Sequence, residues 1–182
     1  MATRFYLHSS GTPGATPAYS ASWYAGCTTP EKLPCAPTKL GTGLATKALT
    51  DADVTDRHYY FGMWVSNSLA AQTIAGAQTI RGSIHCSEDN TKNNMSLHVI
   101  IRVVQSDGTT FRGTLLDFTD DVTEAYSSLR SLFFSATGSR DVVCSAGDML
   151  VIEVGLGGDP ASGGGSHNTT LRIGETVASG DL

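Results

Sequence analysis

A chain of 182 residues is long enough for one domain with a sizeable core, and its 16% of charged residues is low for a globular domain. Its formal net charge of −5, with Lys and Arg scattered along the chain, excludes the basic face that nucleic-acid binding requires. The sequence shows no secretory leader pattern and no apolar run of membrane-spanning length. We therefore expect a chain made in the cytoplasm, without a membrane partner, that reaches any other place by assembly.

The first predicted elements are a short strand and a long irregular stretch. Apolar and polar residues alternate over residues 4–8, as in a strand. Residues 9–37 are rich in Gly, Pro, Ser and Thr and have no periodicity, which is unusual inside a compact domain. Either this stretch is a loop that its aromatic residues hold to its own domain, or it is an arm across a neighbouring subunit. Because its composition cannot form a core of its own, we expect it to contact a neighbouring chain extensively. Its candidate interface anchors are Tyr19, Trp23, Tyr24 and Leu33.

A strand is predicted over residues 57–65, and it is apolar on both faces. Strict alternation assigns Tyr59, Phe61, Met63 and Val65 to one face and Tyr60 and Trp64 to the other. A strand of this kind is covered on both sides, by a second sheet or by a partner. We predict that the Tyr60 and Trp64 side chains lie in a protein–protein contact or under the arm, because exposed apolar patches usually mark interfaces.

The clearest local pattern is a β-hairpin over residues 95–116. Apolar side chains alternate with polar ones before Asp107-Gly108, a dipeptide typical of tight hairpin turns. A bulged turn that pairs Val103 with Gly113 and Ile101 with Leu115 would keep the apolar side chains on one face. We therefore predict this register. Further strands are predicted over residues 78–86, 149–156 and 168–173, the middle one with Leu150, Ile152, Val154 and Leu156 inward.

One short helix is predicted over residues 122–132. Asp121 and Glu124 form a capping-box pattern, and Val122, Ala125, Leu129 and Leu132 follow at helical spacing. Residues 159–166, rich in Gly, Pro and Ser, are expected to form a flexible loop. The whole pattern indicates an all-β fold: a single antiparallel β-sandwich of jelly-roll type over residues 1–182, with one short helix and the arm or loop of residues 9–37.

The residues that carry chemistry do not form a recognisable catalytic or metal-binding pattern. The five histidines lack ligand spacing, although His85 and His98 could neighbour each other on one sheet face. The acidic cluster Asp51, Asp53 and Asp56 lacks the Gly and the distant Glu of a calcium loop. Glu153 and Glu175 have the residue type of a glycosidase pair, but their context is that of ordinary strand carboxylates. We expect no enzymatic activity, no cofactor and no metal.

The four cysteines divide into two pairs. Cys86 and Cys144 lie in or beside predicted strands and are interpreted as buried thiols. Cys27 and Cys35 flank one loop and could form a disulfide under oxidising conditions.

Several stretches of the chain resemble a family of tailed-bacteriophage virion proteins that are often left as hypothetical proteins. They are Thr3-Arg4-Phe5-Tyr6-Leu7 followed by Ser9-Ser10-Gly11 and Trp23, residues 65–74, residues 99–115, and Ala146-Gly147-Asp148 before Val151-Ile152-Glu153-Val154. The resemblance covers most of the chain and carries no catalytic motif. It implies a structural component of a phage particle, without distinguishing head from tail.

Two functions follow from the resemblance. The first is a capsid decoration (cement) protein of the virion, expected to be a homotrimer, with the major capsid protein and copies of itself as partners. The second is a glycan-binding module on the tail or baseplate, for which exposed Tyr60 and Trp64 rings would be needed. Copy number per particle separates the two.

Overall fold

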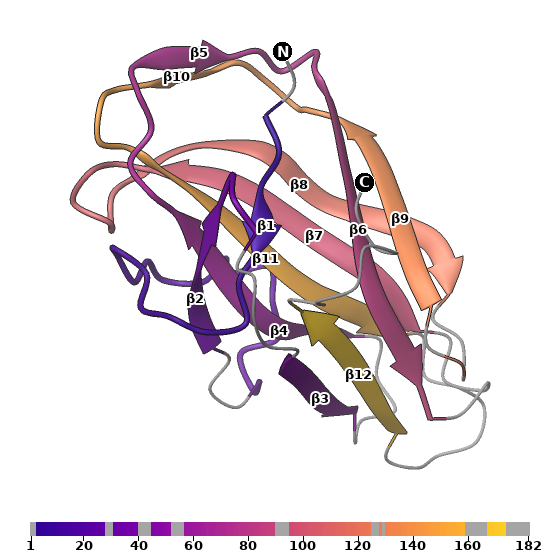
Figure 1. Ribbon diagram of the computed structural model, residues 1–182. Coiled ribbons are helices and arrows are strands. Elements are labelled where there is room, and N and C mark those ends of the chain that lie inside the picture. Colours follow the sequence, from indigo (N-terminus) through magenta and orange to yellow (C-terminus); the bar gives the residue numbers. More distant parts are fainter. Residues whose placement is uncertain are drawn as a thin grey trace.

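The computed structural model describes residues 3–27, 31–39, 45–51, 57–89, 95–124, 128, 130–158 and 167–173. Within these ranges the chain is all β, with twelve strands and no helix, and therefore no helix that could cross a membrane. The largest sheet has six strands in the order β1-β2-β4-β11-β7-β8 (Figure 1). Its strands are β1 (Tyr6–Leu7), β2 (Glu31–Ala36), β4 (Arg57–Ser66), β7 (Met95–Val104), β8 (Phe111–Glu124) and β11 (Met149–Gly158).

A second sheet has four strands in the order β3-β12-β6-β9, and β5 pairs with β10 at one end of the fold (Figure 1). These strands are β3 (Ala45–Asp51), β5 (Gln72–Ile74), β6 (Thr79–Glu88), β9 (Arg130–Thr137), β10 (Val142–Cys144) and β12 (His167–Ile173). Every strand pairing in the described chain is antiparallel except the parallel pair of β2 and β4.

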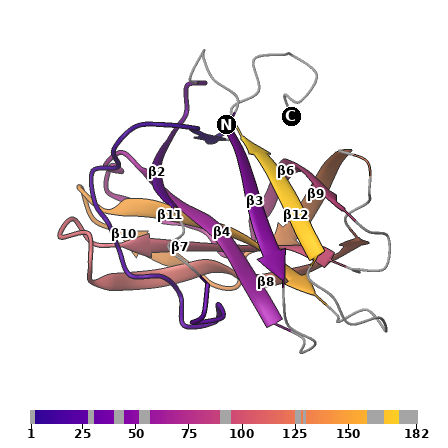
Figure 2. The same cartoon turned by 90° about the horizontal axis from the view of Figure 1, so that it is seen from below.

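The strand orders of the two larger sheets correspond to each other. In four pairs of strands that are consecutive in the chain, one strand lies in each sheet: β3 and β4, β6 and β7, β8 and β9, and β11 and β12. The order β4-β11-β7-β8 in one sheet therefore matches the order β3-β12-β6-β9 in the other. Figure 2 shows the two curled sheets from below, with β3 and β12 crossing the direction of β7 and β11.

One core lies between the two sheets. Along β7 the alternate residues Leu97, Val99, Ile101 and Val103 are buried in it, which confirms the predicted face. Leu150, Val154 and Leu156 of β11 join the same core, with Ile152 packed against it, so the predicted inward face of this strand is also confirmed. Leu132 and Leu171 contribute from the opposite sheet. Each fully buried side chain of this size stabilises the fold by about 1.5–3 kcal/mol.

The β4 strand and its burial on both faces are confirmed, but strict alternation assigned part of it to the wrong faces. The pairing of β4 with β11 is interrupted, since Tyr60 lies opposite Gly155 and Gly62 lies opposite Val154. Phe61 is therefore an extra residue that shifts the alternation by one position. As a result Trp64 joins the core together with Tyr59 and Phe61. Met63, Val65 and Tyr60 belong to separate clusters.

The β7–β8 hairpin is confirmed, with part of its predicted register. Val103 lies opposite Gly113, as a bulged turn requires. Ile101 lies opposite Leu116, so the predicted pairing with Leu115 is wrong. The predicted and observed pairings of Ile101 differ because the register shifts again between Ile101, opposite Leu116, and Arg102, opposite Thr114. At this point the Leu115 carbonyl accepts a hydrogen bond of 2.9 Å from the loop after β9, and Leu115 and Leu116 are both buried.

The predicted helix over residues 122–132 is wrong. β8 continues to Glu124 and β9 begins at Arg130, so both ends of the predicted helix are strands. Ser96 of β7 lies opposite Glu124, and His98 lies opposite Asp120. The pairing of β8 with a long partner strand overrides the local capping-box pattern, because helix propensity is a weak preference.

Other differences concern short or edge strands. The first predicted strand is only β1, and the irregular stretch of residues 9–37 contains β2. The strands β3, β5, β9 and β10 were not predicted. The predicted loop of residues 159–166 lies outside the described residues.

Candidate functional site: an N-terminal strap over the six-stranded sheet

The six-stranded sheet has a second buried face, here called the outer face, which points away from the core between the sheets. Its apolar cluster consists of Met63, Val65, Val104, Met149 and Val151, which alternate with core residues along β4, β7 and β11. Residues 13–24, here called the strap, cover this face with Ala15 and Tyr19. An apolar sheet face needs such a cover to be stable in water.

Aromatic rings fix the second half of the strap. The Tyr60 ring lies between two strap rings, with its centroid 4.1 Å from that of Tyr19 and 5.4 Å from that of Trp23. The Trp23 indole stacks on Tyr60 at an interplanar angle of 22° and is only 6% exposed. Ile100 of β7 completes this cluster. Stacked and edge-on pairs of this kind add about 0.5–1.5 kcal/mol each beyond the burial of their area.

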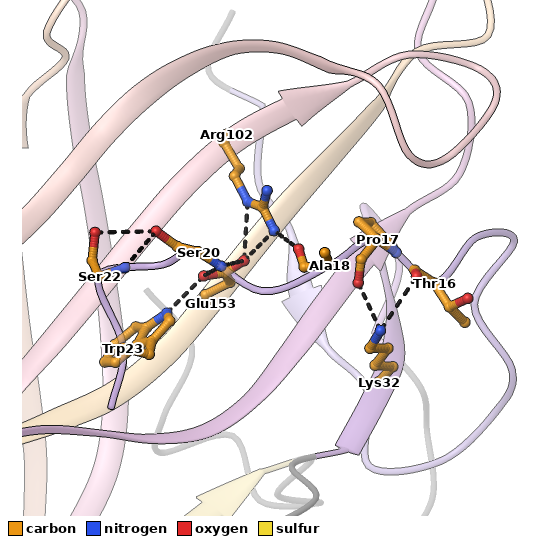
Figure 3. Close-up of polar contacts among 9 residues, drawn as sticks. All are labelled: Thr16, Pro17, Ala18, Ser20, Ser22, Trp23, Lys32, Arg102 and Glu153. Atoms are coloured by element: carbon orange, nitrogen blue, oxygen red, sulfur yellow. Dashed lines mark hydrogen bonds and ion pairs between the residues drawn. The ribbon is translucent and has the colours of Figure 1, made fainter. Parts of the chain in front are cut away.

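The carboxylate of Glu153 on β11 joins the sheet to the strap (Figure 3). It is 0% exposed, and it accepts hydrogen bonds from the Trp23 Nε1 at 2.6 Å, the Ser20 backbone N–H at 3.2 Å and the Arg102 Nε at 3.0 Å. The Arg102 guanidinium also donates to the Ala18 carbonyl. A buried carboxylate is stable only with a paired charge and several hydrogen bonds, and the strap supplies two of the donors.

A lysine holds the first half of the strap. Lys32 Nζ donates to the carbonyl of Pro17 at 2.7 Å and to that of Thr16 at 3.2 Å (Figure 3). The same ammonium group lies 4.7 Å from the centroid of the Tyr19 ring, a cation–π distance. Burial, with the nearby Glu153 charge, raises the pKa of Tyr19 to about 12. The strap is therefore held by side chains from β2, β7 and β11.

Gly155 provides the space in which the Trp23 ring lies. A Cβ at this position would overlap the Trp23 ring and the Tyr59 carbonyl, so only glycine allows the indole to approach the β11 backbone. Gly157, two residues on, leaves space for the His98 ring in the same way.

Three of the six predicted interface residues meet at this site, namely Tyr19, Trp23 and Tyr60. Leu33 and Trp64 lie in the core, where the Trp64 Nε1 donates to the His8 carbonyl at 3.0 Å. Tyr24 is 37% exposed and packs edge-on against Tyr59. Tyr60 and Trp64 are buried, so neither ring forms an exposed platform for a sugar.

The polar residues that hold the strap were missed from the sequence. The sequence pattern indicates Glu153 only as one carboxylate of a glycosidase-type pair with Glu175. Glu175 lies outside the described residues. Arg102 and Lys32 were not singled out. A signal was present, since Glu153 and Arg102 each interrupt a strongly apolar strand at an alternate position. A charge at such a position needs a buried partner.

The remaining candidate groups are dispersed. His85 and His98 lie in different sheets, so they are not neighbours on one face. The ring of His98 instead lies 4.7 Å from that of His58. Within the described ranges, no three His, Cys, Asp or Glu side chains are close enough together to hold a metal ion. Asp53 and Asp56 lie outside these ranges.

All four cysteines are free thiols. Cys86 and Cys144 are buried, which confirms their interpretation from the sequence. Cys27 and Cys35 are not bridged. Burial raises the pKa of Cys27, and it raises that of Cys35 to about 12.

No protein-family model and no curated protein matches the chain. Among solved structures, it is similar to a crystal structure of the infectious bursal disease virus VP2 subviral particle, with 12% identity and a TM-score of 0.25. That match covers 72% of this chain and 33% of the other. A structure of the Gx strain of the same virus matches with 14% identity and a TM-score of 0.25, over 78% of this chain and 36% of the other. This chain thus spans about a third of those chains, and TM-scores this low carry no argument about function.

Proposed function

We propose that this chain is a structural component of a bacteriophage particle, a capsid decoration (cement) protein that stabilises the head through protein–protein contacts. The observation that carries the proposal is the outer face, an apolar sheet surface covered by an extended segment that side chains hold in place. Surfaces of this kind suit the docking of extended polypeptide. The resemblance of several stretches of the sequence to phage virion proteins supplies the setting.

The fold in this proposal is a jelly roll, which is built from eight strands in two sheets. It is supported by the matched orders β4-β11-β7-β8 and β3-β12-β6-β9. Jelly rolls occur in viral capsid domains and in lectins, so the fold suits both the decoration role and the alternative glycan-binding module. The buried Tyr60 and Trp64 rings favour decoration between the two.

The physical benefit of decoration is stabilisation by mass action. A protein that binds only the assembled shell stabilises it by RT ln(1 + [L]/Kd) per site, about 2.7 kcal/mol at a concentration of 100 Kd. The partners in this proposal are the major capsid protein and further copies of the chain, arranged as a trimer. Many copies of a small protein would then offset the strain of a filled head.

Counting copies in purified particles by quantitative mass spectrometry tests the proposal. Hundreds of copies per particle are expected for decoration, whereas a handful would contradict it and favour the tail-associated alternative. A second measurement adds purified chain to undecorated heads and records their thermal disruption, which should shift to higher temperature. Heads that bind no chain would also overturn the proposal.

An arm deletion is a poor variant for these assays. Removing residues 10–37 would also remove β2 and uncover the outer face, so a loss of attachment would have several causes. Trp23→Ala removes one strap anchor and leaves every strand intact. Phe111→Ala is its matched control, since Phe111 is an exposed aromatic side chain outside the strap.

A further inference from the structure

Four residues of the outer face form a socket around the Trp23 side chain. Tyr60 of β4 stacks against the indole, Ile100 of β7 lies in the same cluster, and Glu153 and Gly155 of β11 lie beside and beneath the ring. These three strands are neighbours in the sheet, in the order β4-β11-β7. The socket is therefore built on the rigid centre of the sheet, while its occupant comes from a segment outside the sheet.

The socket is selective for tryptophan. The Glu153 carboxylate accepts the indole N–H at 2.6 Å, a donor that neither Phe nor an aliphatic side chain offers. Gly155 leaves space for a large ring directly on the backbone of β11. A fully enclosed Trp with a satisfied N–H has the properties of an interface hot spot.

Two residues beside the indole also bind the backbone of the strap on the N-terminal side of Trp23. Glu153 accepts from the Ser20 N–H at 3.2 Å, and Arg102 donates to the Ala18 carbonyl. These groups lie three and five residues before Trp23 and fix the direction and register of the segment. Such contacts need only an extended segment of this sequence and do not depend on which chain supplies it.

We infer that the socket also accepts the strap of a second copy of this chain, so that copies associate by exchanging residues 13–24. Every copy carries both the socket and the matching strap, and exchange replaces each contact within a chain by the same contact between chains. Exchange of an identical element is a low-cost route to association for this reason. The inference rests on the proposed function for its biological setting, but it concerns the purified chain alone and can fail independently.

Two full-length variants test the exchange. Trp23→Ala keeps the socket and loses the anchor, whereas Tyr60→Ala keeps the anchor and damages the socket. Neither variant can dock its own strap fully, but in a mixture the strap of the Tyr60→Ala chain can enter the socket of the Trp23→Ala chain. Native mass spectrometry of the mixture should show a mixed species that neither variant forms with itself. Replacing Trp23→Ala by Tyr24→Ala as the partner should give less of the mixed species, because the intact strap of that chain competes for its own socket.

A labelled peptide of residues 13–24 keeps the test decisive if Tyr60→Ala fails to fold. The peptide should bind the Trp23→Ala chain and bind the unaltered chain far more weakly. A peptide with Ala in place of the Trp should bind at least about tenfold more weakly, as expected for a hot spot. Glu153→Gln in the Trp23→Ala chain should weaken binding of the first peptide. Absence of peptide binding overturns the socket, and peptide binding without any mixed species between chains overturns the exchange.

Discussion

Replacing Glu153 by Gln tests how the strap is held to the outer face. The carboxylate is 0% exposed and accepts from the Arg102 Nε at 3.0 Å and from the Trp23 indole at 2.6 Å. The amide removes the negative charge and places an NH₂ group where one oxygen now accepts a hydrogen bond. Breaking a buried ion pair by changing one partner costs about 3–5 kcal/mol. Because the Arg102 side chain is 12% exposed and water can partly compensate its charge, a loss of about 3 kcal/mol is expected.

Urea-induced unfolding, followed by tryptophan fluorescence, measures this loss as a change in the free energy of unfolding. Asp117→Asn is the matched control, since Asp117 is an exposed carboxylate on β8 and its replacement should change stability by no more than about 0.5 kcal/mol. In a double variant, adding Arg102→Met to Glu153→Gln should recover part of the loss, because no unpaired charge remains. A loss for Glu153→Gln as small as that of the control would refute the role given to this carboxylate.

Further predictions concern the core, the hairpin turn, acid sensitivity and thiol reactivity. Leu97→Ala should lower the free energy of unfolding by about 2–5 kcal/mol, measured in urea, because Leu97 is fully buried. Gly108→Ala should be destabilising by the same measurement, since φ at Gly108 is 71° and a Cβ there would overlap the strap; an unchanged midpoint would contradict this. Hydrogen bonds from Arg112 lower the pKa of Asp148 below 3.8, so their contribution to stability is present above that pH and is lost as the pH falls through the lowered pKa. Asp148→Asn should therefore flatten the stability of the protein against pH in this acid range. Burial raises the pKa of Cys35 to about 12, so a thiol reagent should modify it in urea but only slowly in the native protein, as mass spectrometry can measure.

Local patterns in the sequence predicted β4, β7 and β11 of the six-stranded sheet and β6 and β12 of the four-stranded sheet, but they missed β3 and β9 at the edges of the latter. The alternation in β7 and in β11 was sufficient because each of these strands lies between two neighbours and has an unbroken apolar face. Alternation failed in β4, where Phe61 is an extra residue, because a bulge depends on the partner strand and leaves no local signal. The capping-box pattern at Asp121 failed because residues from β7, distant in the sequence, pair with that segment.

The candidate site was predicted in its aromatic half only. Tyr19, Trp23 and Tyr60 stood out as large apolar residues without an obvious core position, and they meet at the strap. Their polar partners come from β2, β7 and β11, so their proximity depends on the order of strands in the sheet. No spacing within the sequence encodes that order.

The matched strand orders have a consequence for how the protein is made. β11 lies between β4 and β7, and β12 lies between β3 and β6, so the last two strands of the described chain occupy the interior of both sheets. Until the ribosome has released these strands, β4 and β7 in one sheet, and β3 and β6 in the other, lack the neighbour that joins them. At a synthesis rate of about 5–20 residues per second, the emerging chain presents these unpaired edges for several seconds. Unpaired edges attract other chains. Completion of both sheets therefore waits for β11 and β12, and until they emerge the unpaired edges are open to association with other nascent chains.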